Sequence, residues 1–250
     1  MAILGILLLV GGAMAGLVGL GGLGLPDLDP DAAAEKSPGP GATFDARDDL
    51  LVGGDGADLL DGGAGGDWII GLDGHDTLTG GTGGDVIIPG AGQDQIAAGD
   101  GNDFVEAANV VDEDALRQSS ATADDIFGVD FAYALPAPSD AADTLDLGPG
   151  DDTVVAGARD ILTGGTGADE FALGDWIGAG GPAEITDFNA AEDIITFVYD
   201  RDGDVPELSI EHDEATGVTT ILADGRSIAV LRDSSPAFSL RNVAVGRYAA

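Results

Sequence analysis

The sequence predicts an all-β protein, in which very short parallel strands stack into a coil and a β-hairpin or meander caps the C-terminal end. Three observations support this prediction. A nine-residue repeat runs through residues 53–106, and the tail from Glu207 alternates apolar and polar residues. The chain also contains 42 glycines but only 5% aromatic residues. Because this composition is atypical of an ordinary packed globule, the core must come from the repeat.

The charge of the chain indicates a cationic ligand. Its 46 acidic and 9 basic residues give a formal net charge of -37, and self-repulsion of this size opposes a compact state. A nucleic acid partner is disfavoured because phosphate binding requires clustered Lys and Arg. Cysteine is absent, which excludes disulfides and thiolate metal sites.

The first segment, residues 1–25, is apolar and lacks charged side chains. It is long enough to cross a hydrocarbon core of ~30 Å as a helix. Three interpretations stay open, namely an uncleaved anchor, a cleaved signal peptide and a hydrophobic tail, because glycines lower helix propensity and no basic residue precedes the run. Any membrane span should leave the repeat outside the cytoplasm. Residues 26–43, rich in Pro, Ala and acids, predict a solvated linker.

The repeat keeps three columns in frames that begin at residues 53, 62, 71, 80, 89 and 98. The sixth place is always aspartate: Asp58, Asp67, Asp76, Asp85, Asp94 and Asp103. The fourth place is always glycine: Gly56, Gly65, Gly74, Gly83, Gly92 and Gly101. The eighth place is always aliphatic: Leu60, Ile69, Leu78, Ile87, Ile96 and Val105. Three columns in register are not a consequence of composition alone.

Each column has a physical role. Glycines permit the positive φ of tight turns and leave carbonyl oxygens uncovered. The residues after each turn predict a three-residue strand whose middle side chain points inward, as in residues 59–61. So short a strand cannot bury that side chain alone, so the units must stack with the aliphatic column as their core. If two units make one coil, alternate aspartates fall on opposite edges.

Stacked aspartates require a cation. Neighbouring carboxylates ~4.8 Å apart repel by roughly 0.9 kcal/mol in water and by more at a partly buried edge. With the glycine carbonyls they form an all-oxygen set, which favours calcium over zinc, copper or magnesium. The sequence therefore predicts a ladder of calcium sites shared between stacked turns. Asp76 is central and Asp103 terminal in these frames, so we expect a substitution at Asp76 to impair folding more.

The nonapeptide GGxGxDxUx resembles the RTX, or hemolysin-type, calcium-binding repeat over residues 53–106. The resemblance implies a parallel β-roll. It also implies ligands from the second-place and fourth-place glycine carbonyls and the sixth-place carboxylates, with third-place aspartates adding oxygens. The metal ligands implied in this way are Gly54, Asp55, Gly56, Asp58, Gly63, Gly65, Asp67, Asp73, Gly74, Asp76, Gly81, Gly83, Asp85, Gly90, Gly92, Asp94, Gly99, Asp100, Gly101, Asp103, Gly150, Asp152, Gly165, Gly167 and Asp169.

A second, degenerate array follows. Asp143, Asp152 and Asp169 each precede an apolar residue by two places. The intervening unit, residues 156–163, is one residue short and lacks the fourth-place glycine. The segment 184–197 resembles the end of RTX rolls and offers Asp187 and Asp193 as last ligands.

The remaining segments have weaker patterns. Residues 107–137 lose the period, although 112–118 predict a short helix and 127–139 a strand or a flap over the roll. The tail has turn signals at residues 215–217 and at Asp224-Gly225, which predict a hairpin or meander. The resemblance implies a type I export signal in this tail. The predicted plan is thus 1–25 apolar segment, 26–43 linker, 44–106 roll, 107–137 insertion, 138–200 second array and 201–250 C-terminal cap.

Three function classes stay open. The favoured one is a non-enzymatic, extracytoplasmic calcium-binding protein that folds when it binds calcium. The alternative is a structural or adhesive surface module held by residues 1–25, whose protein or glycan partner the sequence does not identify. The third is an enzyme with its catalytic part in 107–137 and the C-terminal sheet, although HExxH, GxSxG and P-loop motifs are absent and no catalytic residue is predicted. His75 is expected to face solvent, and Trp68 and Trp176 to pack.

Overall fold

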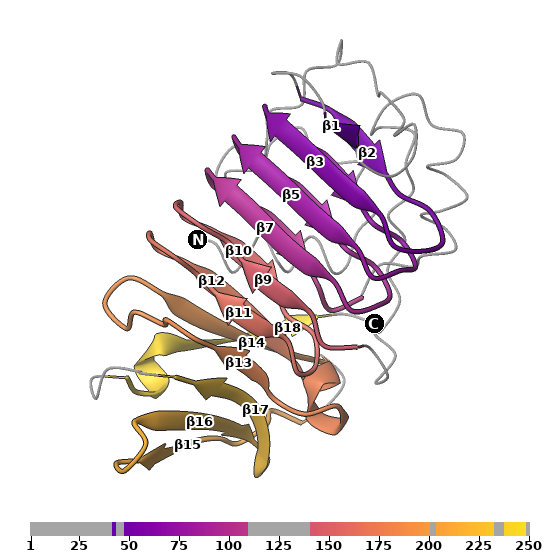
Figure 1. Cartoon of the computed structure of the whole chain (residues 1–250). Helices are drawn as coiled ribbons and strands as arrows, with labels where there is room; N and C mark the ends of the chain where they lie inside the picture. The colour runs from indigo at the N-terminus through magenta and orange to yellow at the C-terminus, as the bar shows by residue number, and fades with distance from the viewer. Residues whose placement is uncertain (1–41, 44–47, 110–140, 201–203, 233–237, 249–250) are drawn as a thin grey trace.

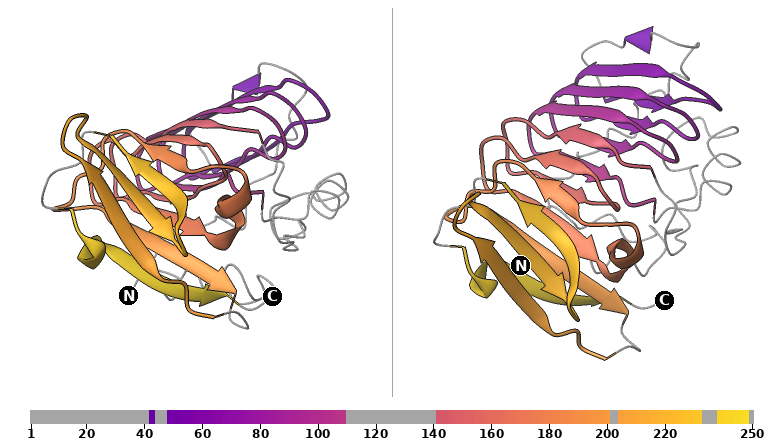
Figure 2. Two further views of the ribbon diagram at one scale, coloured as in Figure 1. Left: turned by 90° about the horizontal axis from the view of Figure 1, so that it is seen from below. Right: turned by 60° about the horizontal axis from the view of Figure 1, so that its bottom comes forward.

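The structure, a computed structural model, describes residues 42–43, 48–109, 141–200, 204–232 and 238–248. Within them the chain forms a flattened coil whose two flat sides are a 10-stranded and an 8-stranded sheet (Figures 1 and 2). The strands of the coil run parallel, which confirms the predicted parallel β-roll.

The 10-stranded sheet, here the first sheet, takes alternate strands of the coil and then the C-terminal meander. In spatial order its strands are β1 (Ala42–Thr43), β3 (Leu59–Ala64), β5 (Thr77–Thr82), β7 (Gln95–Asp100), β9 (Thr144–Asp146), β11 (Ile161–Thr163), β13 (Ala183–Ile185), β17 (Arg226–Leu231), β16 (Val218–Ala223) and β15 (Leu208–Asp213).

The 8-stranded sheet, here the second sheet, takes the other strands of the coil. In spatial order they are β2 (Leu50–Val52), β4 (Trp68–Ile70), β6 (Val86–Ile88), β8 (Phe104–Glu106), β10 (Thr153–Val155), β12 (Glu170–Gly174), β14 (Ile194–Asp200) and β18 (Val243–Tyr248). Two short 3-10 helices, η2 (Asp175–Ala179) and η3 (Leu240–Asn242), lie near the C-terminal end.

The register shows that two repeat units make one coil. Leu60 pairs with Leu78 in the first sheet, and Ile69 pairs with Ile87 in the second. After residue 109 the coil resumes without a break in either sheet, because β7 pairs with β9 and β8 with β10. The second array therefore continues the sheets of the first.

Strand length differs between the sheets. The second-sheet strands β2, β4, β6 and β8 have 3 residues each, as predicted. The prediction is wrong for β3, β5 and β7, which have 6 residues each. Their pairing continues into the glycines of the following turn, as between Gly63 and Gly81, because glycines without side chains let the two backbones stay within ladder distance.

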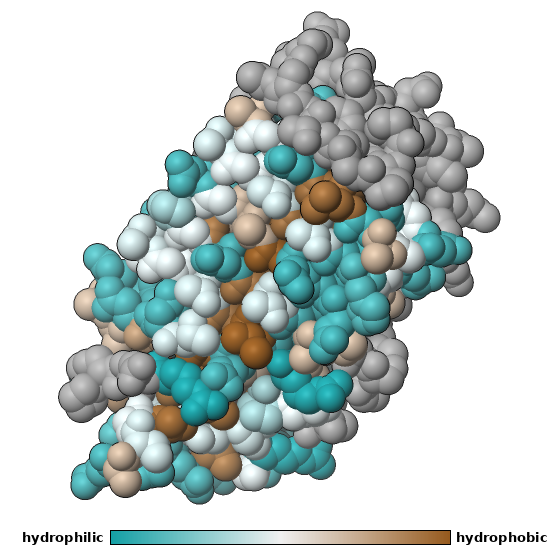
Figure 3. All heavy atoms as spheres, in the orientation of Figure 1, coloured by the Kyte–Doolittle hydropathy of each residue, from teal (hydrophilic) through white to brown (hydrophobic). Residues whose placement is uncertain are grey.

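The core is the eighth-place column. Leu60, Ile69 and Leu78 are fully buried, and the corresponding residues of later coils join the same cluster. The outward face of β3, β5 and β7 is exposed, with Leu59 at 50% and Thr77 also exposed. Figure 3 shows this side as mainly hydrophilic or neutral, with a narrow apolar strip. The stacked units thus bury one aliphatic column, as the sequence predicts.

The C-terminal region confirms the predicted meander. Strands β15, β16 and β17 pair antiparallel, and β17 then joins β13 in parallel. The turn between β16 and β17 uses positive φ at Asp224 and Gly225, 50° and 75°. The final strand β18 returns to the second sheet beside β14.

The described ranges contain no helix long and apolar enough to cross a membrane. The predicted apolar segment 1–25, the helix predicted at 112–118 and the strand or flap predicted at 127–139 fall on residues outside those ranges.

Candidate metal centre

The aspartates form two ladders, one along each side of the roll. We call the side where turns lead from the second sheet to the first the first edge, and the side where they lead back the second edge. The first-edge ladder contains Asp58, Asp76, Asp94, Asp143 and Asp160. The second-edge ladder contains Asp49, Asp67, Asp85, Asp103, Asp152, Asp169 and Asp193.

One carboxylate oxygen of each aspartate fixes the register of the coil. The backbone N–H of Asp67 donates to Oδ1 of Asp85 at 2.8 Å, and that of Asp85 donates to Oδ1 of Asp103 at 2.8 Å. On the first edge the N–H of Asp76 donates to Oδ1 of Asp94 at 2.7 Å. Because these N–H groups are buried, each Oδ1 satisfies a donor that would otherwise be costly.

Both ladders pass the insertion. The N–H of Asp94 donates to Oδ1 of Asp143, and that of Asp103 to Oδ1 of Asp152, each at 2.8 Å. Asp103, expected to be terminal, is therefore an interior member of its ladder. That expectation was wrong because the second array stacks on the first.

Asp160 is a ladder residue that the sequence analysis missed. Its Oδ1 accepts from the N–H of Asp143 at 3.0 Å, and its Oδ2 from the N–H of Gly157 at 2.6 Å. The signal for it was present, since Asp160 precedes the inward Leu162 by two places. The shortened unit obscured it.

The second carboxylate oxygen is in a different situation. In Asp67, Asp76, Asp85, Asp103 and Asp152 the Oδ2 atom is buried and has no hydrogen-bond partner in the described part of the chain. A buried polar atom left unsatisfied is costly, and such an atom at a repeated position indicates a place where a ligand binds.

Backbone carbonyls lie beside these oxygens. A Cβ atom added to Gly80 would collide with both Oδ2 of Asp85 and the carbonyl oxygen of Ala98 in the next coil. A Cβ on Gly83, whose φ is 136°, would collide with the carbonyl oxygen of Gly65. These glycines therefore keep clear a space that carboxylate and carbonyl oxygens from adjacent coils line.

The donor set fits calcium. Among the described residues no group of three or more acidic or histidine side chains gathers as a metal cluster, so side chains alone do not build the site. Carboxylate Oδ2 atoms and carbonyls from adjacent coils together give the all-oxygen, multidentate set that calcium prefers. Asp67 and Asp85, with the first-place carbonyls of Gly80 and Ala98 beside their Oδ2 atoms, would hold ions along the second edge.

Burial makes the charged ladder costly in the metal-free state. It raises the pKa of Asp85 and Asp152 to about 7, even though backbone N–H donors act in the opposite direction. It raises the pKa of Asp67, Asp103 and Asp169 to about 6. On the first edge burial raises the pKa of Asp76 as well. Neighbouring carboxylates add to each shift, so a cation between them would favour the charged forms.

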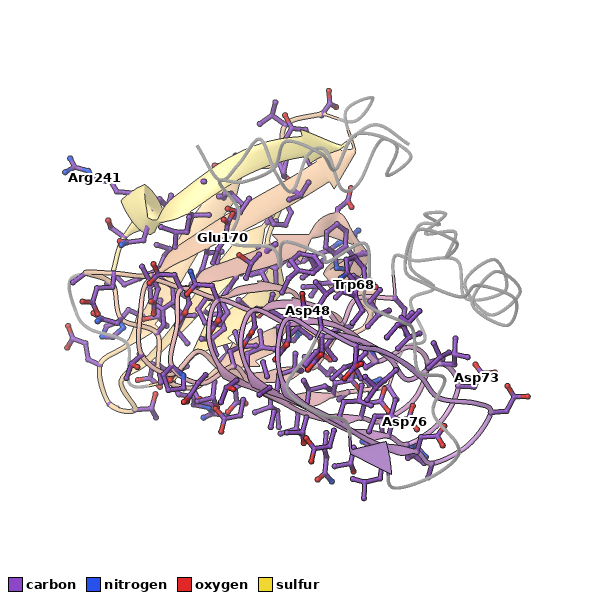
Figure 4. The ribbon with its side chains drawn as sticks, turned by 90° about the horizontal axis from the view of Figure 1, so that it is seen from above. Asp48, Trp68, Asp73, Asp76, Glu170 and Arg241 are labelled. Carbon is purple, nitrogen blue, oxygen red and sulfur yellow. The ribbon has the colours of Figure 1, made fainter. Side chains whose placement is uncertain are left out.

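The structure places first-place carbonyls beside the sixth-place Oδ2 atoms, Gly80 beside Asp67 and Ala98 beside Asp85, and it stacks the fourth-place glycines of successive coils on one another, as Gly150 on Gly101. The predicted second-place and fourth-place carbonyl ligands stay a prediction. The third-place aspartates lie farther out. Asp55 and Asp100 are exposed and Asp73 is half-buried, and Figure 4 shows Asp73 at the periphery of its turn, outside Asp76. Their predicted role as ligands stays a prediction.

The closing segment caps the last coil. Both oxygens of Asp187 accept hydrogen bonds, from the N–H groups of Gly164 and Gly165, each at 2.8 Å. Asp193 accepts from the N–H of Asp169 at 3.1 Å and from that of Asn189 at 2.7 Å. The two aspartates predicted as last ligands thus engage the last turn of the second edge through backbone groups.

Fifth-place side chains form an outer set of contacts that the sequence analysis did not predict. Oδ1 of Asn102 accepts from the N–H of Asp151, and Oδ1 of Asp151 accepts from that of Ala168, each at 2.9 Å. On the first edge His75 is exposed, as expected, and its Nδ1 accepts from the N–H of Gln93 at 3.0 Å. These contacts tie successive turns together outside the aspartate ladders.

Comparison with known proteins identifies the repeat. The RTX calcium-binding nonapeptide repeat (4 copies) matches residues 45–78, 70–105 and 139–158. No curated protein is similar in sequence to the chain at a significant level.

Two solved structures are similar to the chain. The extracellular lipase LipA from Serratia marcescens is 19% identical with a TM-score of 0.30, and the match covers 81% of this chain and 40% of the lipase. The AlgE6R3 subunit of the Azotobacter vinelandii mannuronan C5-epimerase is 20% identical with a TM-score of 0.21, and the match covers 86% of this chain and 84% of the subunit. The chain thus spans less than half of the lipase's length.

The sixth-place aspartates of the matched segments stand in both ladders, and those segments lie on either side of the insertion in one continuous roll. Residues 45–105 and 139–158 thus consist of RTX calcium-binding nonapeptide repeats.

Proposed function

We propose that this is a non-enzymatic, extracytoplasmic calcium-binding protein whose roll folds when calcium bridges successive coils. The observation that supports it most is the buried, unpartnered Oδ2 atom of Asp85, repeated at Asp67 and Asp103 along one edge. Without a cation, stacking these buried carboxylate oxygens one above another would only cost desolvation and repulsion energy.

The two carboxylate oxygens of each ladder aspartate have different roles. Oδ1 holds the register through the N–H of the preceding coil, and Oδ2 with the neighbouring carbonyls would hold the ion. Calcium supplies the positive charge that offsets repulsion between stacked carboxylates. Extracellular calcium modules have Kd values of about 0.1 to 1 mM. At tenfold excess each ion then adds ~1.4 kcal/mol to stability, so five such sites would add about 7 kcal/mol, which is comparable to the whole stability of a domain.

Sites of this affinity would fill only where calcium is abundant, so we infer a location outside the cytoplasm, and the RTX repeats of residues 45–105 and 139–158 support this inference. Protease treatment of intact cells tests the location. We expect cleavage or loss of the roll without lysis, and cleavage only after lysis would overturn the placement. Screening of hydrolase substrates in the presence of calcium tests the non-enzymatic assignment, and reproducible turnover that calcium removal abolishes would contradict it.

The decisive experiment is a calcium titration of the full chain followed by circular dichroism, with sedimentation or scattering for compaction. Calcium in the millimolar range should induce β-structure and compaction. Magnesium at equal concentration should not, because it requires a small octahedral site and retains its waters. Equal responses to both ions would mean charge screening and would remove the specific-site proposal.

A further inference from the structure

The outward face of the second sheet differs sharply from that of the first. On β4, β6 and β8 the outward side chains are apolar with one exception, and each is at most 7% exposed. They are Trp68, Ile70, Val86, Ile88, Phe104 and Glu106. The corresponding positions of the first sheet include Leu59, which is 50% exposed.

The described elements do not account for this burial. β4, β6 and β8 have their principal contacts with neighbouring strands of the same sheet and, across the core, with β3 and β5. The helix η2 contacts β12, β14 and β17 at the other end of the roll. An apolar face of this extent is a surface that another segment or molecule covers.

We propose that the covering segment is the insertion of this chain, residues 110–140, docked on the outward face of β4, β6 and β8. The insertion starts where that face ends, since Ala107 and Ala108 follow β8 directly and are each 1% exposed. The ladder offset at this coil is 49 residues, against 18 at the coils before it and 17 at the coil after it. One coil therefore carries a long additional segment beside this face.

The sequence of the insertion fits such a surface. Apolar side chains occupy every second place from residue 127 to 135: Phe127, Val129, Phe131, Tyr133 and Leu135. Glycine, aspartate and alanine occupy the places between them. An alternation of this kind gives an extended segment one apolar side and one small or polar side. The apolar side matches Trp68 and its neighbours in chemistry.

Trp68 provides the test, because the chain has only 2 tryptophans. In the full, calcium-loaded chain, Trp176→Phe leaves Trp68 as the single fluorophore. Adding Val129→Asp and Phe131→Asp should shift its emission to the red and raise acrylamide quenching severalfold. The matched control, Ala132→Asp with Ala134→Asp, changes the opposite side of the alternation and should leave both readings unchanged. The calcium-induced circular dichroism signal should stay the same in all variants, which shows that the roll itself is folded.

Three outcomes would overturn the proposal. Unchanged quenching of Trp68 in the Val129→Asp, Phe131→Asp variant would mean that the insertion does not cover it. Exposure of Trp68 after deletion of residues 1–25, but not after the insertion changes, would assign the face to the N-terminal segment. If Trp68 became accessible to acrylamide on dilution while the mass of the particle halved, the face would be covered by a second copy of the chain. If the insertion variant fails to fold, replacing residues 127–135 with a Gly/Ser segment repeats the test, and buried Trp68 in that folded chain would refute the proposal.

Discussion

The two edges of the roll carry the same aspartate ladder but differ in continuity. The second edge keeps complete turns through the whole roll, at residues 62–67, 80–85, 98–103, 147–152 and 164–169. The first edge has complete turns only at 53–58, 71–76 and 89–94, and then carries the insertion and the shortened turn before Asp160. Under the proposed function, calcium sites form between complete turns, so we expect the second edge to contribute more to calcium-linked folding than the first edge.

The largest effect should come from Asp85→Ala, in the middle of the second edge. The change removes an oxygen from the sites on both sides of it, worth ~1.4 kcal/mol each at tenfold calcium excess. It also leaves the buried N–H of Asp67 without its acceptor, at a cost of about 1–3 kcal/mol. Calcium titrations by circular dichroism should show a severalfold higher midpoint and a lower Hill slope.

The matched variant Asp85→Asn distinguishes the register role of Oδ1 from the role of the carboxylate charge in calcium binding. It keeps an Oδ1 acceptor and removes the charge, so the metal-free chain should gain structure while the calcium response weakens. Asp146→Ala, on the exposed outward face of β9, should leave both unchanged. If Asp85→Asn behaved like wild type in the titration, the carboxylate would not be a ligand.

Gly83→Ala should have the next largest effect, because the new methyl group would collide with the carbonyl oxygen of Gly65. Backbone strain and overpacking together should cost about 3 kcal/mol or more. Gly217→Ala is the control, since its φ is also positive at 73° but nothing lies within 4 Å of the added methyl; it should cost only ~1–2 kcal/mol. Urea unfolding in calcium measures both, and similar losses would mean that coil stacking is looser than the structure shows.

Asp76→Ala on the first edge should be milder than Asp85→Ala. It also removes an oxygen from two sites, but the N–H that loses its acceptor belongs to Asp58, which is only half-buried and can bond water instead. The midpoint should therefore shift less, and the Hill slope should change little, because the second edge stays complete. Equal shifts for both variants would mean that the edges are equivalent.

The smallest effect concerns pH in the metal-free chain. The pKa of Asp85 and Asp152 is raised to about 7, and that of Asp67, Asp103 and Asp169 to about 6, from 3.8. Between about pH 4 and 7 the folded state therefore binds more protons than the unfolded state, and its stability rises as the pH falls. With a chelator present, the circular dichroism signal of β-structure should be stronger at pH 5 than at pH 8. Asp85→Asn with Asp152→Asn should flatten this dependence, and a β-structure signal that rises with pH would contradict the burial of these groups.

Much of the roll follows from its exact period. Columns such as Asp67 to Asp85 and Ile69 to Ile87 fix the register, the edges and the inward face, because one coil of two units brings like places together. The carbonyl half of the site stays a prediction for the second-place and fourth-place glycines, and the carbonyl oxygens beside the Oδ2 atoms of Asp67 and Asp85 come from the first place, from Gly80 and Ala98.

The rest depended on contacts that a local pattern does not contain. Asp103 became interior, and Asp160 joined a ladder, because pairing resumed across a gap of many residues. The length of β3 came from glycine pairing between coils rather than from strand propensity. The run Trp68–Ile70 has apolar side chains on both faces of its strand, which is a sequence signal for burial of the outward face. Only the structure shows how completely that face is buried.

The insertion point has a consequence for how such a chain can diversify. The hydrogen bond from the N–H of Asp94 to Oδ1 of Asp143 has nearly the same length as that from Asp76 to Asp94, 2.8 Å against 2.7 Å. The contact between these two coils is therefore the same whatever segment connects them. Loop-closure entropy grows only with the logarithm of length, and doubling a loop costs about 0.6 kcal/mol. A gene could therefore lengthen or exchange the parts of this stretch outside residues 127–135 at little cost, and an engineer could graft a foreign peptide there, displayed or withdrawn according to the calcium concentration around it.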